Sequence, residues 1–287
     1  MKTNIAGLNV DFTNRTDLFK SISERINAKR TTWLTTLYSE FLYLSLRDKS
    51  IQNLLNHADI ALPDGISMFW AREFLRLPLK NRNRAVRYAE AIWQVTHTLY
   101  ETFSKKQNII SVNEEKIPGS ELVWDLAKYA AENNLTIFLL GGFGRVPELV
   151  AHALENKERR LSGKIFFSNK NPDDASILND IKISKANIIL VAYGPIKQEN
   201  WIFKNIHELP EVKIFIGLGG TFDYIAGVKS PPPGWIRTSG LEWLWRLVTQ
   251  PYRMTRIFNS TCGLIYELAR YKITRGQVEK IAKKSYN

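Results

Sequence analysis

Six short apolar runs constrain the fold of this chain most, and several of them are followed by glycine or a tight turn. They span residues 31–37, 58–62, 136–140, 164–167, 186–192 and 212–217. The apolar character within each run is unbroken rather than alternating, which indicates strands covered on both faces. Amphipathic helical patterns lie between them, as at 39–47, 119–132 and 146–156. The alternation predicts an α/β fold, with a Rossmann-like, mostly parallel sheet flanked by helices.

Two segments interrupt this alternation. Residues 79–115 are basic and then amphipathic, which predicts a helical insertion. Residues 230–234 read Ser-Pro-Pro-Pro-Gly, a stiff stop, and apolar residues at helical spacing follow it. We therefore expect a Rossmann-like domain over residues 1–227, with the insertion at about 79–115, and a basic amphipathic appendage over residues 228–287.

The positive charge is concentrated in this appendage. The chain has a net charge of +12, and residues 227–287 hold eleven Lys or Arg residues against three Glu. Such asymmetry predicts a polyanionic partner. Tryptophans beside basic residues, such as Trp243 and Trp245, suit an anionic membrane surface. The same aromatic residues interleaved with arginines also suit stacking on the bases of a nucleic acid.

The chain has a single cysteine, Cys262, which excludes an internal disulfide framework and is typical of a reducing cytosol. No segment reaches the roughly 18 apolar residues needed to span a bilayer. The first residues also lack the apolar run of a signal peptide. We expect a cytoplasmic protein that meets membranes only at their surface.

Three glycine clusters follow predicted strands. Because the carboxyl ends of parallel strands share one edge of a sheet, these clusters should lie together, and their backbone N–H groups can approach a phosphate. A tight turn or a solvated helix start is the plainer interpretation of each cluster alone. Together they predict a nucleotide or nucleotide-sugar cleft, with these candidate donor-binding residues: Gly141, Gly142, Gly194, Lys197, Glu199, Gly219, Gly220, Thr221 and Asp223.

Asp64 lies in a Pro-Asp-Gly turn directly after a predicted strand. A carboxylate there suits a general base, and it equally suits an ordinary turn. The four histidines, at positions 57, 97, 152 and 207, lack zinc-ligand spacing. No Asp-X-Asp motif is present to hold a metal on a diphosphate. We expect neither a metal site nor a cofactor.

Taken in order, the motifs resemble those of the WecG/TagA/CpsF glycosyltransferases, family 26 of the sequence-based classification. The likeness runs from about Thr31 to Arg256, apart from the insertion. The matching segments are HADIALPDG (57–65), IPGSEL (117–122), FLLGG (138–142), YGPIKQENW (193–201), IGLGGTFDYIAG (216–227), GLEWLWR (240–246) and QPYR (250–253).

This resemblance implies an inverting, metal-independent transfer from a UDP-sugar, which is a substrate rather than a cofactor. The sugar would be N-acetylmannosamine, its uronic acid or a related hexose. The acceptor would be a saccharide linked to polyprenyl diphosphate, in the synthesis of a cell-surface polysaccharide or teichoic acid. The enzyme would then work on the inner face of the cell membrane, without nucleic acid, and whether it forms a homo-oligomer stays open.

The resemblance also implies residue roles. Asp64 would deprotonate the acceptor hydroxyl, Thr36 would line the site and Gln198 would position substrate. Three arginines of the appendage would close over the donor: Arg246, Arg253 and Arg256. The chain departs from the family pattern at Tyr38, where asparagine is usual, and at Lys116, where arginine is common. A lysine cannot reproduce a bidentate guanidinium contact, so the donor or the acceptor is expected to differ.

Two other functions compete with this interpretation. A Rossmann-type nucleotide-binding oxidoreductase would place an acidic ribose partner about 20 residues after its glycine turn, and no clear candidate follows Gly144. A non-enzymatic nucleic-acid-binding module would depend on the basic appendage alone. The ordered motifs favour the glycosyltransferase.

Overall fold

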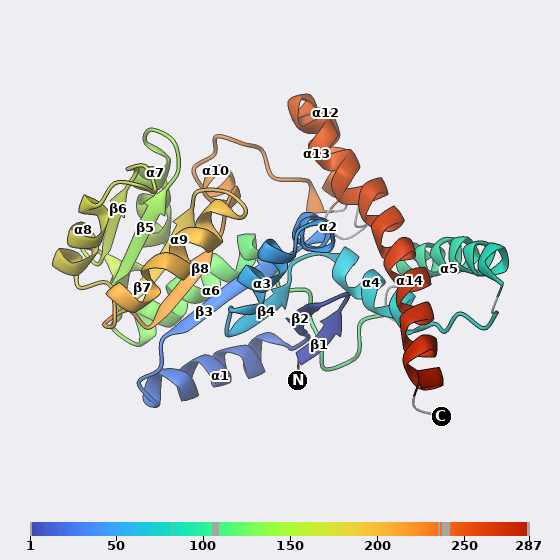
Figure 1. The fold of residues 1–287 in the computed structure, drawn as a ribbon. Helices are drawn as coiled ribbons and strands as arrows, with labels where there is room; N and C mark the ends of the chain where they lie inside the picture. Colours follow the sequence, from blue (N-terminus) through green and yellow to red (C-terminus); the bar gives the residue numbers. More distant parts are fainter. Residues whose placement is uncertain (1, 82, 105–108, 235, 237–241, 286–287) are drawn as a thin grey trace.

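The computed structural model describes residues 2–81, 83–104, 109–234, 236 and 242–285, without the side chains of residues 242, 246 and 275–285. Its centre is a six-stranded, wholly parallel sheet, which confirms the predicted α/β class (Figure 1). The strand order is β4-β3-β8-β7-β5-β6. The strands are β3 (Thr32–Leu37), β4 (Ile60–Pro63), β5 (Ile137–Gly141), β6 (Ile165–Ser168), β7 (Ile188–Ala192) and β8 (Ile214–Gly217).

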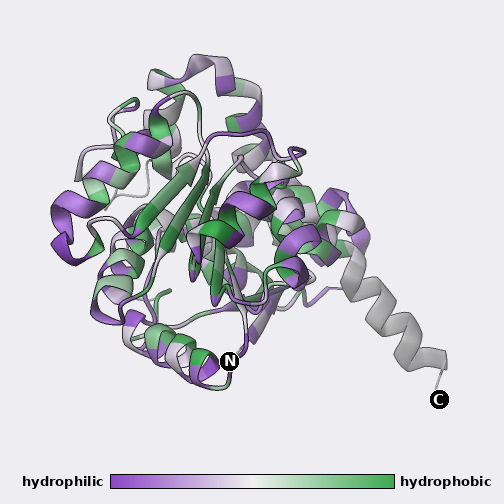
Figure 2. Cartoon of the chain, turned by 90° about the vertical axis from the view of Figure 1, so that its left-hand side faces the viewer, coloured by the Kyte–Doolittle hydropathy of each residue, from purple (hydrophilic) through white to green (hydrophobic). Residues whose placement is uncertain are grey.

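Helices cover both faces of this sheet, as the unbroken apolar runs predicted. One face packs on α1 (Arg15–Asn27), α6 (Gly119–Glu132), α7 (Val146–Lys157) and α10 (Thr221–Ile225). The other face packs on α3 (Lys49–Asn56), α8 (Ser176–Ser184) and α9 (Lys197–Asn205). Figure 2 shows the resulting layers, with hydrophobic strands between helices that carry both hydrophobic and hydrophilic residues.

The direction in which successive strands are added to the sheet changes between the neighbouring strands β5 and β7. From β5 the chain continues through α7 to the edge strand β6, whereas from β7 it continues through α9 to β8 on the opposite side. Loops that leave neighbouring strands in opposite directions open a crevice at the carboxyl edge, where α/β proteins bind ligands. The glycine clusters after β5 and β7 lie at this switch point.

A second hydrophobic core lies beside the β4 edge of the sheet. It joins the hairpin β1 (Lys2–Ile5) and β2 (Leu8–Asp11) to three helices: α2 (Ser39–Arg47), α4 (Ile66–Arg76) and α14 (Leu264–Ser285). Leu264 and Leu268 of α14 are buried there. The predicted appendage therefore contributes side chains to a core that includes the first strands of the chain.

The remaining helices complete this side of the molecule. The predicted insertion contains one long helix, α5 (Arg84–Ser104), which packs against α4 and α14. Two short helices, α12 (Glu242–Thr249) and α13 (Met254–Phe258), lead into α14 and form a rod with it (Figure 1). None of the helices in the described part of the chain is long and apolar enough to cross a membrane.

Candidate active site

Asp64, the predicted base, stands at the carboxyl end of β4. Its backbone N–H donates to the carbonyl of Leu37, the last residue of β3, at 2.9 Å. The carbonyl of Pro63 accepts from the N–H of Ile117 at 3.4 Å, so the segment before α6 joins the same edge. The half-buried Asp64 thus lies where two strand ends and the approach to α6 meet.

Thr36 faces the first turn of α6. A Cβ atom added to Gly119 would lie 3.3 Å from the Oγ1 of Thr36, 3.2 Å from Leu218 and 3.7 Å from the Oγ1 of Thr221. A larger residue at position 119 would press on both strand ends. The absence of a side chain at Gly119 therefore allows α6 to start against the ends of β3 and β8, beside two threonine hydroxyls.

Gln198 connects α9 to the loop after β8. Its side chain is almost wholly buried, with 3% exposed. The Oε1 atom accepts from the N–H of Gly219 at 2.9 Å, and Nε2 donates to Oε1 of Glu199 at 2.9 Å. A Cβ atom on Gly217 would overlap the Gln198 amide at 2.4 Å, so a larger residue at this strand end would displace that amide. Gln198 therefore shapes the glycine loop predicted to meet the donor.

Glu199 is fully buried, and its carboxylate holds the turn before α9. Oε2 accepts from the N–H of Ile196 at 2.7 Å. Ile196 has a φ of 69°, which is strained for a β-branched residue. Burial raises the pKa of the Glu199 carboxyl to about 7. Through these contacts, Glu199 stabilises the conformation of the loop before α9. Lys197, at the start of α9, is exposed to solvent.

The glycines after β5 and β7 meet as expected. Gly141, Gly142 and Gly194 have φ values of 92°, 87° and 86°, which favour glycine. The N–H of Gly142 donates to the carbonyl of Ala192 at 3.3 Å, so the two strand ends are joined. With Gly219 nearby, the three predicted clusters lie along one continuous edge.

Asp223 is already paired. Its carboxylate forms a half-buried ion pair with Lys229, and the N–H of Lys229 donates to the Asp223 carbonyl at 3.0 Å. Thr221, at the start of α10, is buried, and Gly220 before it is exposed. Among the residues predicted after β8, the backbone of Gly219 and Gly220 and the hydroxyl of Thr221 therefore lie closest to the carboxyl edge. Asp223 instead stabilises the turn that follows α10.

The appendage reaches the edge through Arg256. Its Nε and Nη2 atoms contact the two carboxylate oxygens of Glu40 at 2.5 and 2.6 Å. The hydroxyl of Tyr38 donates to the same carboxylate at 3.3 Å. Because Tyr38 and Glu40 directly follow β3, this cluster joins α13 to the edge and includes one of the two departures from the family pattern.

The other predicted arginines are less closely connected to the edge. The guanidinium of Arg253 lies 5.6 Å from the ring centre of Tyr252. Arg246 belongs to α12, and its side chain is outside the described residues. Glu40, which pairs with Arg256, was missed at the level of sequence. Its position in the first turn of a helix directly after a strand was the available signal.

Two ion-pair clusters lie next to Lys116, the second position at which the chain departs from the family pattern. Arg72 is nearly buried and contacts both carboxylate oxygens of Glu114, at 2.7 and 3.0 Å. Arg15 contacts Glu115 at 3.0 Å and further carboxylates of α6. These ion pairs fix residues 114–116. Directly after them, the hydrogen bond between Ile117 and Pro63 joins the chain to the end of β4.

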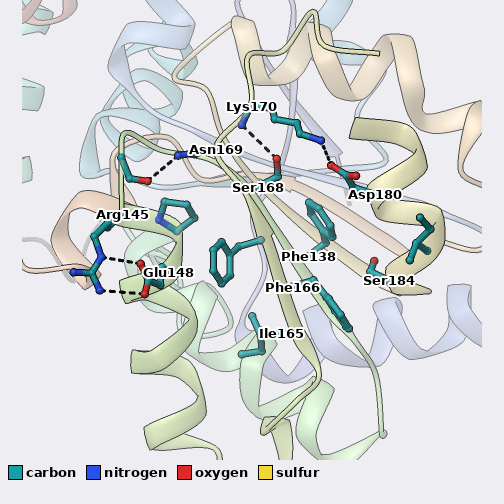
Figure 3. Close-up of a pocket in the computed structure, with 14 residues that line it drawn as sticks. Phe138, Arg145, Glu148, Ile165, Phe166, Ser168, Asn169, Lys170, Asp180 and Ser184 are labelled. Atoms are coloured by element: carbon teal, nitrogen blue, oxygen red, sulfur yellow. Dashed lines mark hydrogen bonds and ion pairs between the residues drawn. The ribbon is translucent and has the colours of Figure 1, made fainter. Parts of the chain in front are cut away.

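A separate pocket of about 860 Å³ lies at the other edge of the sheet, between α7, β6 and α8. Figure 3 shows Phe138 and Phe166 in it, with the ion pairs Arg145–Glu148 and Lys170–Asp180 at its rim. None of the predicted site residues lines it. The pocket borders the glycine turn after β5 through Gly144.

The described part of the chain contains no cluster of three or more His, Cys, Asp or Glu side chains suited to a metal ion. The groups available for a phosphate at the edge are backbone N–H groups at the glycine turns and the exposed amine of Lys197. Helix starts with such N–H groups bind anions readily.

Known proteins resemble this chain over nearly its whole length. Three similar proteins come from Staphylococcus aureus strains MRSA252, NCTC 8325 / PS 47 and COL, and each is named N-acetylglucosaminyldiphosphoundecaprenol N-acetyl-beta-D-mannosaminyltransferase. Each is 24% identical over 273 residues, which cover 94% of this chain and 93% of the relative.

A family model matches the chain as well. It covers residues 3–103 and 108–278, which include the sheet, the carboxyl edge, α5 and most of the appendage. The predicted resemblance is thereby confirmed, and so is the expectation of a glycosyltransferase. The chain belongs to the glycosyl transferase WecG/TagA/CpsF family.

Proposed function

We propose that this enzyme transfers N-acetylmannosamine, or a related hexose, from a UDP-sugar to N-acetylglucosamine on polyprenyl diphosphate. The names of the relatives support both the sugar and a lipid-linked acceptor of this type. The observation that carries the proposal is the single carboxyl edge that presents Asp64, Thr36 and the Gln198–Gly219 contact. The product would serve the synthesis of teichoic acid or another cell-surface polysaccharide.

The proposed reaction is one direct displacement. The Asp64 carboxylate accepts the proton of the acceptor hydroxyl while that oxygen bonds to the anomeric carbon of the donor. The bond between this carbon and the UDP oxygen breaks on the opposite face, so the anomeric configuration inverts. General-base catalysis of this kind is typically worth ~10²–10⁴-fold in rate.

The leaving UDP carries negative charge that the protein must stabilise. Backbone N–H groups at the glycine turns and the Lys197 amine lie at the appropriate edge for this task. The sequence contains no Asp-X-Asp motif, which supports a metal-independent transfer. Arg253 and Arg256 are proposed to add positive charge when donor binds.

The appendage is proposed to seat on an anionic membrane. Its helices α12 and α13 expose Trp243, Leu244, Val248, Met254 and Phe258, with fractions from 41% to 73%. Aromatic and aliphatic side chains beside arginines suit the interfacial region of a bilayer. The Arg256–Glu40 pair would then connect membrane contact to the reacting edge.

A screen of UDP-sugars tests the proposal. The full-length enzyme is incubated with a short polyprenyl-diphosphate N-acetylglucosamine analogue, with and without EDTA, and UDP release is measured. We expect release with UDP-N-acetylmannosamine or a related donor, unchanged by EDTA, and a product of inverted anomeric configuration by NMR. A retained configuration would contradict the displacement, and loss of release with EDTA would contradict metal independence.

A further inference from the structure

Helix α5 buries polar side chains and exposes large apolar ones, which is unusual for a helix at a protein surface. Its inward positions carry the buried polar residues Arg87, Gln94, Thr98 and Thr102, together with the buried Ala91 and with Val95 and Leu99, which pack against the second hydrophobic core. Its outward positions carry large apolar and aromatic residues. A surface helix normally turns its apolar stripe toward the core and its polar residues toward water. The buried polar residues and the exposed apolar residues each require an explanation.

The polar residues of the inward face are tolerated because they are hydrogen-bonded to neighbouring helices. Thr98 accepts from the indole N–H of Trp70 in α4 at 3.0 Å. Gln94 accepts from the amine of Lys272 in α14 at 2.5 Å. Arg87 donates to the carbonyl of Ile273 at 2.6 Å. These contacts from two helices fix the rotation of α5, so its outer face is presented in a defined direction.

The outward face is broad, apolar and strongly exposed. Its members and their exposed fractions are Val86 40%, Tyr88 43%, Ile92 66%, Trp93 63%, Tyr100 64% and Phe103 47%. The hydroxyl of Thr96, between them, donates to the carbonyl of Ile92 at 3.0 Å. The acids Glu90 and Glu101 are only partly exposed, and Glu90 accepts from the backbone of Lys80. Contiguous exposed apolar patches mark interaction sites.

We propose that α5 lies in the interfacial region of an anionic bilayer, with this outer face inserted among the lipids. The helix would rest flat on the membrane as a second contact, independent of the exposed residues of α12 and α13. Because α4 begins two residues after Asp64 and α5 packs on α4, this contact would hold the β4 edge close to the membrane.

The chemistry of the face favours lipid over a protein partner. Lys80 and Arg84 are exposed at the start of the helix, and Arg76, the last residue of α4, is exposed as well. Basic residues at the ends of an apolar face complement anionic headgroups. Tryptophan and tyrosine prefer the interfacial depth of a bilayer. The choice of a bilayer also rests on the lipid-linked acceptor of the proposed function.

Vesicle co-flotation tests the inference without any substrate. The full-length protein is mixed with phosphatidylcholine vesicles containing 30% phosphatidylglycerol, and the bound fraction is measured for wild type, Ile92→Ser and Trp93→Ser. We expect each substitution to weaken binding roughly ten-fold, because each removes apolar surface from the lipid. Ile183→Ser is the matched control, since Ile183 is 72% exposed on α8, at the far end of the molecule (Figure 1).

Substitutions of the basic residues provide a second test in the same flotation experiment. Lys80→Gln and Arg84→Gln are each expected to weaken binding about five-fold with anionic vesicles, and to have little effect with pure phosphatidylcholine. Unchanged binding of Ile92→Ser and Trp93→Ser would overturn the inference. So would a dimer, seen by sedimentation equilibrium, that Ile92→Ser dissociates while vesicle binding persists. Because flotation needs no donor or acceptor, failure of the proposed reaction would be seen separately, in UDP release.

Discussion

The carboxyl edge of the sheet and the C-terminal appendage are held in place by different kinds of interaction. At the edge, backbone hydrogen bonds join neighbouring strand ends, as between Asp64 and Leu37, and glycines allow close approach. The appendage is attached by side chains, through the Arg256–Glu40 pair and the hydrogen bonds of Lys272, as well as by the buried leucines of α14. The edge geometry therefore follows from the fold itself, whereas single substitutions can alter how the appendage docks.

The largest effect is expected from Asp64→Asn at the edge. Loss of the base should lower transfer ~10²–10⁴-fold, because the acceptor hydroxyl keeps its proton during attack. UDP binding should stay nearly intact, since the substitution changes neither the glycine turns nor Lys197. UDP release and calorimetric titration with UDP measure the two effects.

Asp173→Asn, on an exposed loop, is the matched control and should be silent. Turnover of Asp64→Asn within ten-fold of wild type would contradict the assignment of the base.

The second effect concerns the pH dependence of stability at the edge. Burial raises the pKa of Glu199 to about 7 from 4.5, so the folded protein favours the protonated acid. The free energy of unfolding should therefore fall as pH rises from about 4.5 to 7, by at most ~1.4 kcal/mol per pH unit. Urea unfolding between pH 5 and 8 measures this slope.

Glu199→Gln cannot ionise and should lose less stability over the same range. Parallel slopes for wild type and Glu199→Gln would show that this carboxyl does not carry the pH dependence.

The appendage should respond to pH with the opposite sign. Burial lowers the pKa of Lys272 to about 8 from 10.5, so the folded protein binds fewer protons than the unfolded chain in this range. The free energy of unfolding should rise by about 1–2 kcal/mol as pH increases from 8 toward 10.5. Lys272→Met, which cannot titrate, should lack this increase when both proteins are unfolded in urea. An equal rise in both would exclude Lys272 as its source.

The smallest effect is expected for the ion pair that connects the two regions. Arg256 and Glu40 are partly exposed, and a double-mutant cycle with alanine should give a coupling free energy of about 1 kcal/mol. Donor kinetics then separate two roles of Arg256. If the pair only docks the appendage, Arg256→Ala and Glu40→Ala should raise the KM for donor equally. A larger rise for Arg256→Ala would indicate that this arginine also contacts the donor.

Much of the sheet was predictable because buried parallel strands have a local signature. The runs at 31–37 and 136–140 match β3 and β5 to within one residue, and the predicted helices at 39–47 and 119–132 match α2 and α6. The alignment of the strand-end motifs along one edge followed from the parallel arrangement alone. Local apolar periodicity and glycine positions carry this information.

Partners between distant residues were not predictable in this way. Glu40 and Arg256 are 216 residues apart, and their pairing depends on how α13 crosses α2. Glu199 has the sequence context of a loop ligand, and its burial and its hydrogen bond to the N–H of Ile196 could not be read from that context. A carboxylate in a sequence looks the same whether it faces solvent, a backbone N–H or a guanidinium.

The sequence by itself determined the six strands of the parallel sheet, the glycine turns at several strand ends and the family to which the enzyme belongs. Only the tertiary structure decided which charged residues are already paired and which face of α5 points outward. The physical reason is that backbone conformation responds to neighbouring residues, whereas the partner of a side chain is set by packing. Trp70 and Lys272, on either side of α5 in the chain, hydrogen-bond the buried polar residues of this helix, and its apolar outer face stays exposed.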